Sequence, residues 1–391
     1  MKKSLTRRRL PAVCIALGAM TLAGGASAQQ TSTGNSATLY GFVRLDAVYD
    51  NKAQSADDWA SLLMTQPAST AGGNKGFYAT ARTSRLGVKG ALADGQVKYQ
   101  LEGDMNGNTN EGGVRPGTLA TNSTGFRLRQ AYLSTGNWLF GQTWSTAFDG
   151  ASLPETVEFN PPLTAVALRQ AQVRYTASFG GGNSLAVALE NPSSNVMDLN
   201  SNDIANKSKR PDLVARFTHQ AGWGHVSLMG ASHQYALNSG QSATGSLLAM
   251  GASANLGAGG SRLVAGLTSG DGAGRYQWAS LLQGAVQRAN GSISTFKSTG
   301  YHVGVTMPWG APGVRSNLNY AATSFKDAAA GDFVAGLHNK KLSQVQLNTF
   351  FPLAKGVEGG IELATGTRKH MDTTKADGKE SRINFMVTAS F

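Results

Sequence analysis

Apolar and polar residues alternate along most of the chain with a period of two. Residues 37–50 place Leu39, Val43 and Leu45 on one face and Arg44 and Asp46 on the other. Because successive side chains point to opposite sides of a strand, this pattern predicts a strand with one apolar and one polar face.

The last residues, 381–391, carry the same alternation up to the terminal aromatic residue Phe391. A strand in this position would leave a sheet edge unpaired, and closure of the sheet into a barrel removes that edge. We therefore expect the 381–391 strand to pair with the strand over residues 37–50.

Sixteen segments show the strand pattern, bounded by turn residues. They are 37–50, 76–90, 96–105, 125–134, 137–144, 168–177, 183–190, 211–219, 224–236, 245–256, 260–269, 298–308, 313–323, 341–351, 356–366 and 381–391. One residue conflicts with its segment, because the parity of Arg82 places it on the apolar face of Leu86 and Val88. Arg82 therefore requires a bulge, a position among lipid headgroups or a different strand boundary.

The connections between these segments alternate between short and long. The short ones are rich in Gly or Pro and lie at 93–95, 134–136, 180–182, 221–222, 257–259 and 308–312. The long ones are 51–75, 106–124, 145–167, 191–210, 270–297, 324–340 and 367–380. Short turns at one rim and long loops at the other are typical of outer-membrane barrels. A soluble sandwich gives no reason for this segregation, and the fixed repeat of a β-helix is missing.

The pattern thus predicts an all-β fold, a 16-stranded antiparallel transmembrane β-barrel with short periplasmic turns and long extracellular loops. A barrel of this size is too wide for side chains to fill, so we expect a water-filled lumen lined by the polar faces. Aromatic residues near strand ends would form interfacial girdles. The candidates are Tyr40, Phe42, Trp138, Phe140, Trp223, Trp309, Phe351 and Phe391.

Residues 1–28 have the pattern of a signal peptide. Basic residues precede an apolar stretch from Leu10 to Ala23, and Ala26-Ser27-Ala28 supplies small residues for cleavage. Cleavage would leave one barrel domain over residues 29–391. It would also remove Cys14, the single cysteine, so the mature chain would have no disulfide.

Charge and motifs argue against other classes of protein. The chain has 35 basic and 23 acidic residues, and loss of five basic residues with the signal peptide leaves 30 − 23 = +7. The remaining basic residues are spread singly, which does not favour nucleic-acid binding. The six histidines lack metal-ligand spacing, and the glycine-rich run from Gly270 to Gly274 opens a polar loop instead of a helix. We therefore expect no enzyme activity, metal or cofactor.

Several segments resemble known outer-membrane proteins. The run from Ala37 to Ala47 looks like the first strand of Gram-negative general porins, and 84–90 resembles their second. The segments 129–132 (RQAY), 141–145 (GQTWS), 154–161 (PETVEFNP) and 270–276 (GDGAGRY) look like the DcaP-like porins, with a resemblance over essentially the whole mature chain. The founding member has a helical extension before its first strand, whereas only residues 29–36 precede the strand here.

The resemblance implies a homotrimeric porin in the lipid and lipopolysaccharide of the outer membrane. It implies passage of small hydrophilic solutes, favouring small anionic solutes such as dicarboxylates. It also implies that Phe391 is the signal read by the outer-membrane barrel assembly machinery, and that the third long loop, residues 145–167, folds into the lumen as a constriction.

Charged residues then define the expected pore. The acidic side of the constriction is the loop, with Asp149, Glu155 and Glu158. On the basic side, strand parity selects Arg44, Arg85, Arg129 and Arg174, on strands that should face the loop. Other lumen charges are Lys89, Lys98, Arg127, Arg216, Arg262, Arg315 and Arg382. Cations favour anion passage, and facing acids would create a transverse field.

Two alternatives remain open at this point. Each arginine could be a wall residue, paired with Asp46, Glu102, Asp104, Glu358 or Glu362 and without a role in selection. The whole barrel could instead be a surface enzyme or adhesin that acts through its long extracellular loops. A gated or energised importer is a weaker option, since the chain offers no plug-sized amino-terminal domain.

Overall fold

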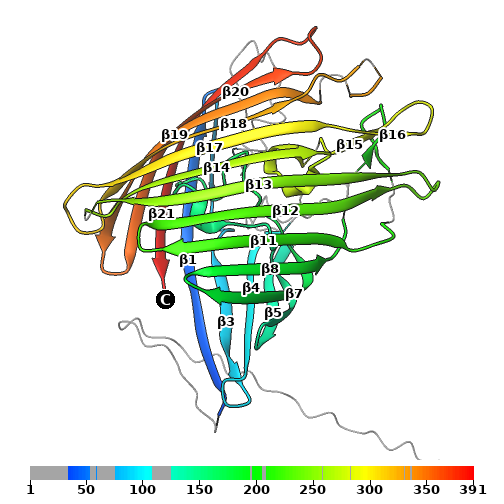
Figure 1. The fold of residues 1–391 in the computed structure, drawn as a ribbon. Coiled ribbons are helices and arrows are strands. Elements are labelled where there is room, and N and C mark those ends of the chain that lie inside the picture. Colours follow the sequence, from blue (N-terminus) through cyan, green and yellow to red (C-terminus); the bar gives the residue numbers. More distant parts are fainter. Residues whose placement is uncertain are drawn as a thin grey trace, which may run out of the picture.

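Long antiparallel strands make up most of the chain in the computed structural model (Figure 1). The structure describes residues 34–391 except 53–58, 60–74, 108–124, 194, 195, 205–207, 258, 282, 330, 335 and 336. The signal peptide expected at residues 1–28 lies outside the described residues, so its cleavage stays a prediction. Among the described residues, no helix has the length and apolar character needed to cross a bilayer.

The strands of the main sheet have the following bounds. They are β1 (Ser36–Asp50), β2 (Gly76–Thr80), β3 (Arg85–Leu92), β4 (Val97–Gly107), β5 (Gly125–Thr135), β6 (Trp138–Trp144), β7 (Arg169–Gly180), β8 (Asn183–Glu190), β11 (Asp212–Ala221), β12 (Gly224–Ala236), β13 (Ser242–Leu256), β14 (Ser261–Asp271), β17 (Lys297–Pro308), β18 (Arg315–Phe325), β19 (Asn339–Ala354), β20 (Val357–His370) and β21 (Gly378–Ser390). A small second sheet comprises β9 (Val196–Met197), β10 (Asp203–Ile204), β15 (Ala285–Gln287) and β16 (Ile293–Thr295). Short 3₁₀ turns are η1 (Gly150–Ser152), η2 (Gly274–Tyr276) and η3 (Trp278–Ser280).

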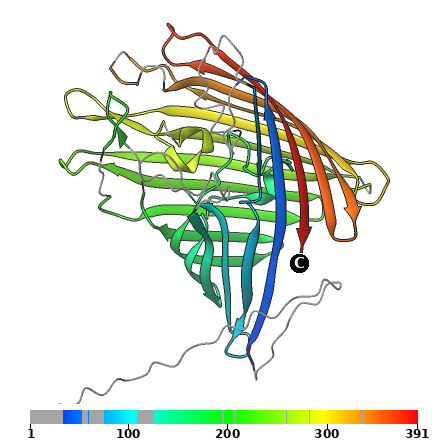
Figure 2. The ribbon, with the colours of Figure 1, turned by 180° about the vertical axis from the view of Figure 1, so that it is seen from behind.

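The main sheet is a closed barrel of sixteen wall strands, as the sequence predicts. Its seventeen strands include β2 and β3, which pair in tandem with the single strand β1 and count as one wall strand, so 17 − 1 = 16. Each wall strand corresponds to one of the sixteen expected segments. Closure occurs between β1 and β21, which lie side by side in Figures 1 and 2, and Gly41 and Phe391 exchange two backbone hydrogen bonds of 3.1 Å.

The break between β2 and β3 resolves the conflict at Arg82. The chain turns at residues 81–84, where the amide of Ser84 donates to the carbonyl of Ala81 at 3.0 Å. Arg82 is buried, and its Nε donates to the Thr80 hydroxyl at 3.0 Å. An interrupted strand, not one continuous strand over 76–90, therefore keeps this guanidinium away from lipid.

The apolar faces of the wall strands point outward. On β18, Leu318 is exposed, while the alternate residues Asn317 and Asn319 are buried inside the barrel. On β19, Leu347 is exposed between buried Gln346 and Asn348. This is the inverse of a soluble barrel and suits a wall surrounded by lipid.

Two aromatic residues assigned to the interfacial girdles lie on the inner face instead. Tyr40 donates from its hydroxyl to Glu102 at 2.9 Å, and the ring of Phe42 lies 4.8 Å from the guanidinium carbon of Arg85. Both share the parity of Arg44, so their girdle assignment is wrong. Trp138, Trp223, Trp309 and Phe391 are exposed, as a girdle requires.

Apolar clusters inside the barrel join two long loops to the wall. One cluster packs Ala147 and Val166, from the loop after β6, against Val214, Met229 and Leu247 of the wall. The segment 272–296 lies against the same loop, with backbone hydrogen bonds from Trp278 to Ala165 (3.0 Å) and from Ala279 to Leu163 (2.8 Å). Part of the interior is thus packed by these two loops.

Candidate functional site

The infolded loop, residues 145–168 between β6 and β7, is held at its beginning by a buried carboxylate. Glu190 of β8 accepts hydrogen bonds from the Ser145 hydroxyl at 2.9 Å and from the Thr146 amide at 2.7 Å. Gln170 and Tyr276 also donate to Glu190, which is 1 % exposed. All of these contacts are buried inside the barrel. They hold the loop against the inside of the wall from its first residue.

Asp149 fixes the next part of the loop to β12. Its carboxylate lies 2.9 Å from His225 Nε2 and accepts from the Ser227 hydroxyl at 2.5 Å. Burial alone would raise the pKa of Asp149, but the hydrogen bonds from Ser227 and His225 and the nearby charge of Arg216 lower it below its ordinary value. Asp149 therefore stays ionised in its contact with the wall.

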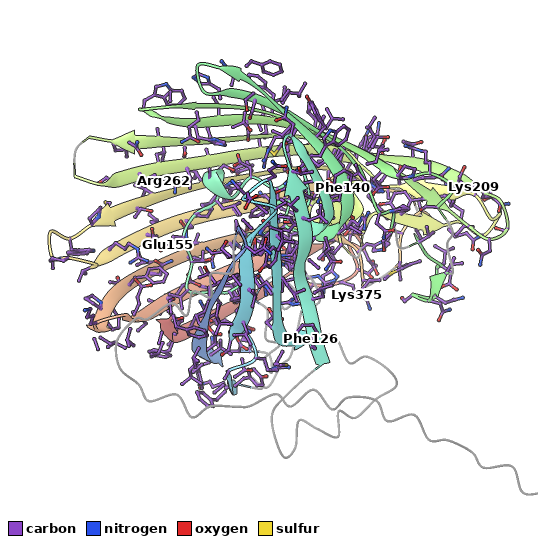
Figure 3. All side chains as sticks on the ribbon, turned by 90° about the horizontal axis from the view of Figure 1, so that it is seen from below. Phe126, Phe140, Glu155, Lys209, Arg262 and Lys375 are labelled. Carbon is purple, nitrogen blue, oxygen red and sulfur yellow. The ribbon has the colours of Figure 1, made fainter. Side chains whose placement is uncertain are left out.

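Arginines and a histidine bind the loop backbone along the following strands. Arg216 of β11 donates to the Phe148 carbonyl, and Arg262 of β14, labelled in Figure 3, donates to the Ala151 carbonyl. His302 of β17 lies 3.0 Å from the Ser152 carbonyl and 2.7 Å from the Thr164 hydroxyl.

The far part of the loop contacts β18 to β21. Glu155, also labelled in Figure 3, forms an ion pair with Arg315, which binds Glu358 at 2.7 Å as well. Glu158 lies 3.4 Å from Arg382, which also pairs with Asp50 at 2.7 Å.

The side-chain carboxylate of Glu362, on β20, binds backbone amides of the infolded loop. It accepts from the Val157 amide at 2.9 Å and from the Glu158 amide at 3.3 Å. Beyond it, Arg44 of β1 donates to the Val157 carbonyl at 2.6 Å. The infolded loop thus spans the inner face from β8 through β21 to β1.

The three loop acids assigned to the constriction are therefore bound to the wall. Asp149 and Glu158 keep 6 % and 5 % of their side chains exposed, and Glu155 keeps 39 %. Each has a basic partner on a strand: His225, Arg382 or Arg315. Of these three loop acids, only Glu155 is exposed enough to contribute to a transverse field.

Strands β3 to β7 carry three of the four arginines assigned to the basic side, namely Arg85, Arg129 and Arg174. Arg129 binds Glu102 and Asp104, each at 2.8 Å, and is 4 % exposed. Arg85 lies 3.4 Å from Glu102. Arg44 contacts Asp46 at 2.6 Å in addition to the loop. Arg44, Arg85 and Arg129 thus have the carboxylate partners that a wall residue would have.

Another group of inner-face cations has no such partner. No described carboxylate lies within ion-pair distance of Lys89, Lys98, Arg174, Arg216 or Arg262. Arg174 and Arg216 are near enough for their like charges to interact. Arg127, Arg315 and Arg382 are ion-paired. The predicted lumen charges thus divide into compensated and uncompensated sets.

Comparison with known proteins identifies the family. The chain matches the DcaP outer membrane protein family over residues 24–391. It belongs to the DcaP family. The resemblance predicted from the sequence and the outer-membrane localisation are confirmed. No curated protein sequence matches this DcaP-family chain.

Solved structures support the same assignment. The outer membrane channel DcaP of Acinetobacter baumannii is 26 % identical, with a TM-score of 0.77 and coverage of 93 % of this chain and 99 % of that one. An anion-selective porin from Comamonas acidovorans is 18 % identical (TM-score 0.59, coverage 91 % and 100 %). OmpF of Salmonella typhi, in complex with daunomycin, is 13 % identical (TM-score 0.59, coverage 93 % and 100 %). The last two share the fold. Homotrimer formation and recognition of Phe391 by the assembly machinery stay predictions.

One arginine at the infolded loop of this DcaP-family chain was missed by the sequence reasoning. Arg169 is the first residue of β7, and its guanidinium carbon lies 3.3 Å from the ring centroid of Trp144. Trp144 stacks in turn on Phe148 of the loop, with centroids 3.9 Å apart. Nε of Arg169 is buried without a hydrogen-bond partner, and no described carboxylate pairs with the side chain.

Charges of both signs act on the guanidinium of Arg169. They are the like charges of Arg129, Arg85 and Arg127 and the opposite charge of Glu102. Strand parity could not select Arg169, because it alternates with the inner-face residues Gln170 and Gln172. Its position was a usable signal, because Arg169 directly follows the loop and the aromatic residue Trp144 directly precedes the loop.

Proposed function

We propose that this DcaP-family barrel forms a diffusion channel for small hydrophilic solutes and favours anions. The observation that carries the proposal is the set of inner-face cations without carboxylate partners: Lys89, Lys98, Arg174, Arg216 and Arg262. Small dicarboxylates suit such a surface because their two charges can contact two cations at once.

The infolded loop supports this proposal by where it places negative charge. Glu158 is buried against Arg382, and Asp149, buried against His225, forms no ion pair with these five cations, although its charge acts on Arg216. A lumen with surplus positive charge attracts anions and repels cations, most strongly at low ionic strength. The anion-selective porin from Comamonas acidovorans shares this fold and is consistent with the proposal.

Reconstitution into planar lipid bilayers tests the function directly. We expect discrete conductance steps, and a reversal potential in a KCl gradient that indicates chloride permeating faster than potassium. Addition of a dicarboxylate such as succinate should reduce the chloride current by competition. Bilayers that remain silent would reject the channel, and potassium preference would reject the anion selectivity. The surface enzyme or adhesin stays a prediction that no contact described here favours.

The uncompensated cations should set the selectivity. A double substitution Arg174→Glu/Arg216→Glu changes the lumen charge by four units. In water, one charge about 6 Å from a passing ion contributes roughly 0.7 kcal/mol, which changes the local concentration of that ion about threefold. We expect the chloride-to-potassium permeability ratio to fall at least tenfold in 0.1 M salt and less in 1 M salt, where screening is stronger. Reversal potentials at both salt concentrations measure it.

Lys375→Glu is the matched control, because Lys375 lies on an exposed loop (Figure 3). It should leave the permeability ratio close to that of the unsubstituted barrel. Equal ratios for the double variant and for this control would show that Arg174 and Arg216 take no part in selection.

A further inference from the structure

A cavity of about 210 Å³ lies beside the long-loop end of β12 and is separate from the infolded loop. Its lining consists of Ser193, His233, Tyr235, Gly274, Arg275, Leu281 and Gly284. Gly274 and Arg275 belong to the 270–276 segment, which the sequence reasoning left as a surface loop. Water occupies about 30 Å³ per molecule in the liquid, so the cavity has room for a small organic solute.

His233 lines the cavity, and one nitrogen of its ring has no hydrogen-bond partner. His233 is 1 % exposed, and its Nε2 lies 2.9 Å from the Gly272 carbonyl. A carbonyl oxygen can only accept, so Nε2 must carry a proton. Nδ1 is buried without a hydrogen-bond partner. A second proton would place an imidazolium in a buried site beside Arg275, which is unfavourable. Nδ1 is therefore an unused acceptor.

Arg275 also lines the cavity, and not all of its hydrogen-bond donors have an acceptor. One terminal nitrogen of Arg275 donates to the Asn191 carbonyl at 2.5 Å and to Asp212 at 2.7 Å. Its Nε is buried without a hydrogen-bond partner. The site thus offers a positively charged donor at Arg275 and a neutral acceptor at His233.

The surrounding residues fix these two groups in position. The Tyr235 hydroxyl donates to the same Gly272 carbonyl at 2.9 Å, and the His233 ring packs edge-on against Tyr235 with centroids 4.9 Å apart. A side chain at Gly274 or Gly284 would collide with the Tyr235 hydroxyl, so only glycine fits at these positions. Tyr276, next to Arg275, donates at 2.9 Å to Oδ2 of Asp212, the same oxygen that accepts from Arg275.

We propose that this cavity is a binding site for a small 2-hydroxycarboxylate. The carboxylate accepts from Arg275, and the hydroxyl donates to Nδ1 of His233. A simple carboxylate satisfies only the first group and leaves Nδ1 unpaired, so the hydroxyl determines specificity. The inference rests on the proposed function in one respect: the occupant belongs to the small anions that the channel admits. Binding itself requires no conduction.

Calorimetric titration of the detergent-solubilised barrel with lactate and propionate tests the site, because the two probes differ only by the hydroxyl. We expect lactate to bind and propionate to bind at least tenfold more weakly. His233→Phe should reduce lactate affinity to the level of propionate, and Arg275→Gln should remove binding of both. His219→Phe, a histidine outside the cavity lining, should change neither affinity.

Equal binding of the two probes, no binding of lactate at tens of millimolar, or loss of affinity only in His219→Phe would each overturn the proposal. Should His233→Phe fail to fold, nitrogen NMR of the unsubstituted barrel decides, since the His233 Nδ1 resonance must move when lactate is added and not when propionate is added. A barrel that binds lactate but is silent in bilayers would reject the channel and retain the site.

Discussion

Replacing Glu362 with leucine is expected to detach part of the infolded loop and to increase the single-channel conductance with frequent current fluctuations. Glu362 is fully buried and accepts from two loop amides, Val157 and Glu158. It also accepts from Gln346, Asn348 and Asn384 of the neighbouring strands. Leucine would leave most of these donors unpaired inside the barrel, while Asn348 would keep the Glu155 carbonyl as its acceptor.

The size of the effect follows from the cost of unpaired buried groups. Each donor left without a partner costs roughly 1–3 kcal/mol, so several kcal/mol would oppose the present loop position. Movement of the loop segment around Val157 gives its amides access to water and avoids part of that cost. Glu362→Gln should have an intermediate effect, because the amide keeps one acceptor oxygen.

Glu358→Gln is the control for this prediction. Glu358 lies on the same strand but keeps 35 % of its side chain exposed, and its partner is Arg315 and not the loop backbone. Its conductance should stay near that of the unsubstituted barrel. Single-channel recordings of Glu362→Leu with ordinary conductance and a quiet open level would show that Glu362 does not hold the loop in place.

The strands were predictable because their signal is local. Alternation at 383–391 and the short turn at 180–182 depend on residues close in the sequence, and the structure places β21 and the β7 to β8 turn there. The interruption at 81–84 has no such signal. It depends on the burial of Arg82 beside Thr80. Strand parity indicates only that Arg82 does not fit the apolar face of its segment.

Parity indicates the direction of a charged side chain on a strand but not its partner. Arg129 and Arg174 both face inward, yet Arg129 is paired with two acids while Arg174 has no described carboxylate partner. Glu362 was expected as a partner for an arginine and instead binds loop amides. Such differences depend on contacts between distant segments, since Val157 and Glu362 are 205 residues apart.

Loop residues were the least predictable, because no periodicity relates a loop side chain to a direction. Asp149 was expected to face the pore and contacts His225, 76 residues away. The stack of Arg169, Trp144 and Phe148 forms only because the loop leaves β6 and returns to β7 at neighbouring positions.

Arg169→Ala is expected to lower the chloride-to-potassium permeability ratio with little loss of stability. Its guanidinium has no described carboxylate partner, so removal leaves no buried acid behind. The stack on Trp144 contributes roughly 0.5–2 kcal/mol. In water, one charge about 6 Å from a passing ion contributes roughly 0.7 kcal/mol, which changes the local concentration of that ion about threefold. Arg169→Lys retains the charge and should retain the ratio.

Arg129→Ala provides the contrast that separates a selecting arginine from a structural one. Arg129 compensates Glu102 and Asp104, whose side chains are 4 % and 0 % exposed, and breaking a buried pair costs roughly 3–5 kcal/mol. We expect a clearly lower thermal unfolding temperature, together with a shift toward cations because two acids lose a partner. If Arg169→Ala instead lowered the unfolding temperature as much as Arg129→Ala and left the permeability ratio unchanged, Arg169 would be a structural residue and the free cations on the strands would account for selectivity alone.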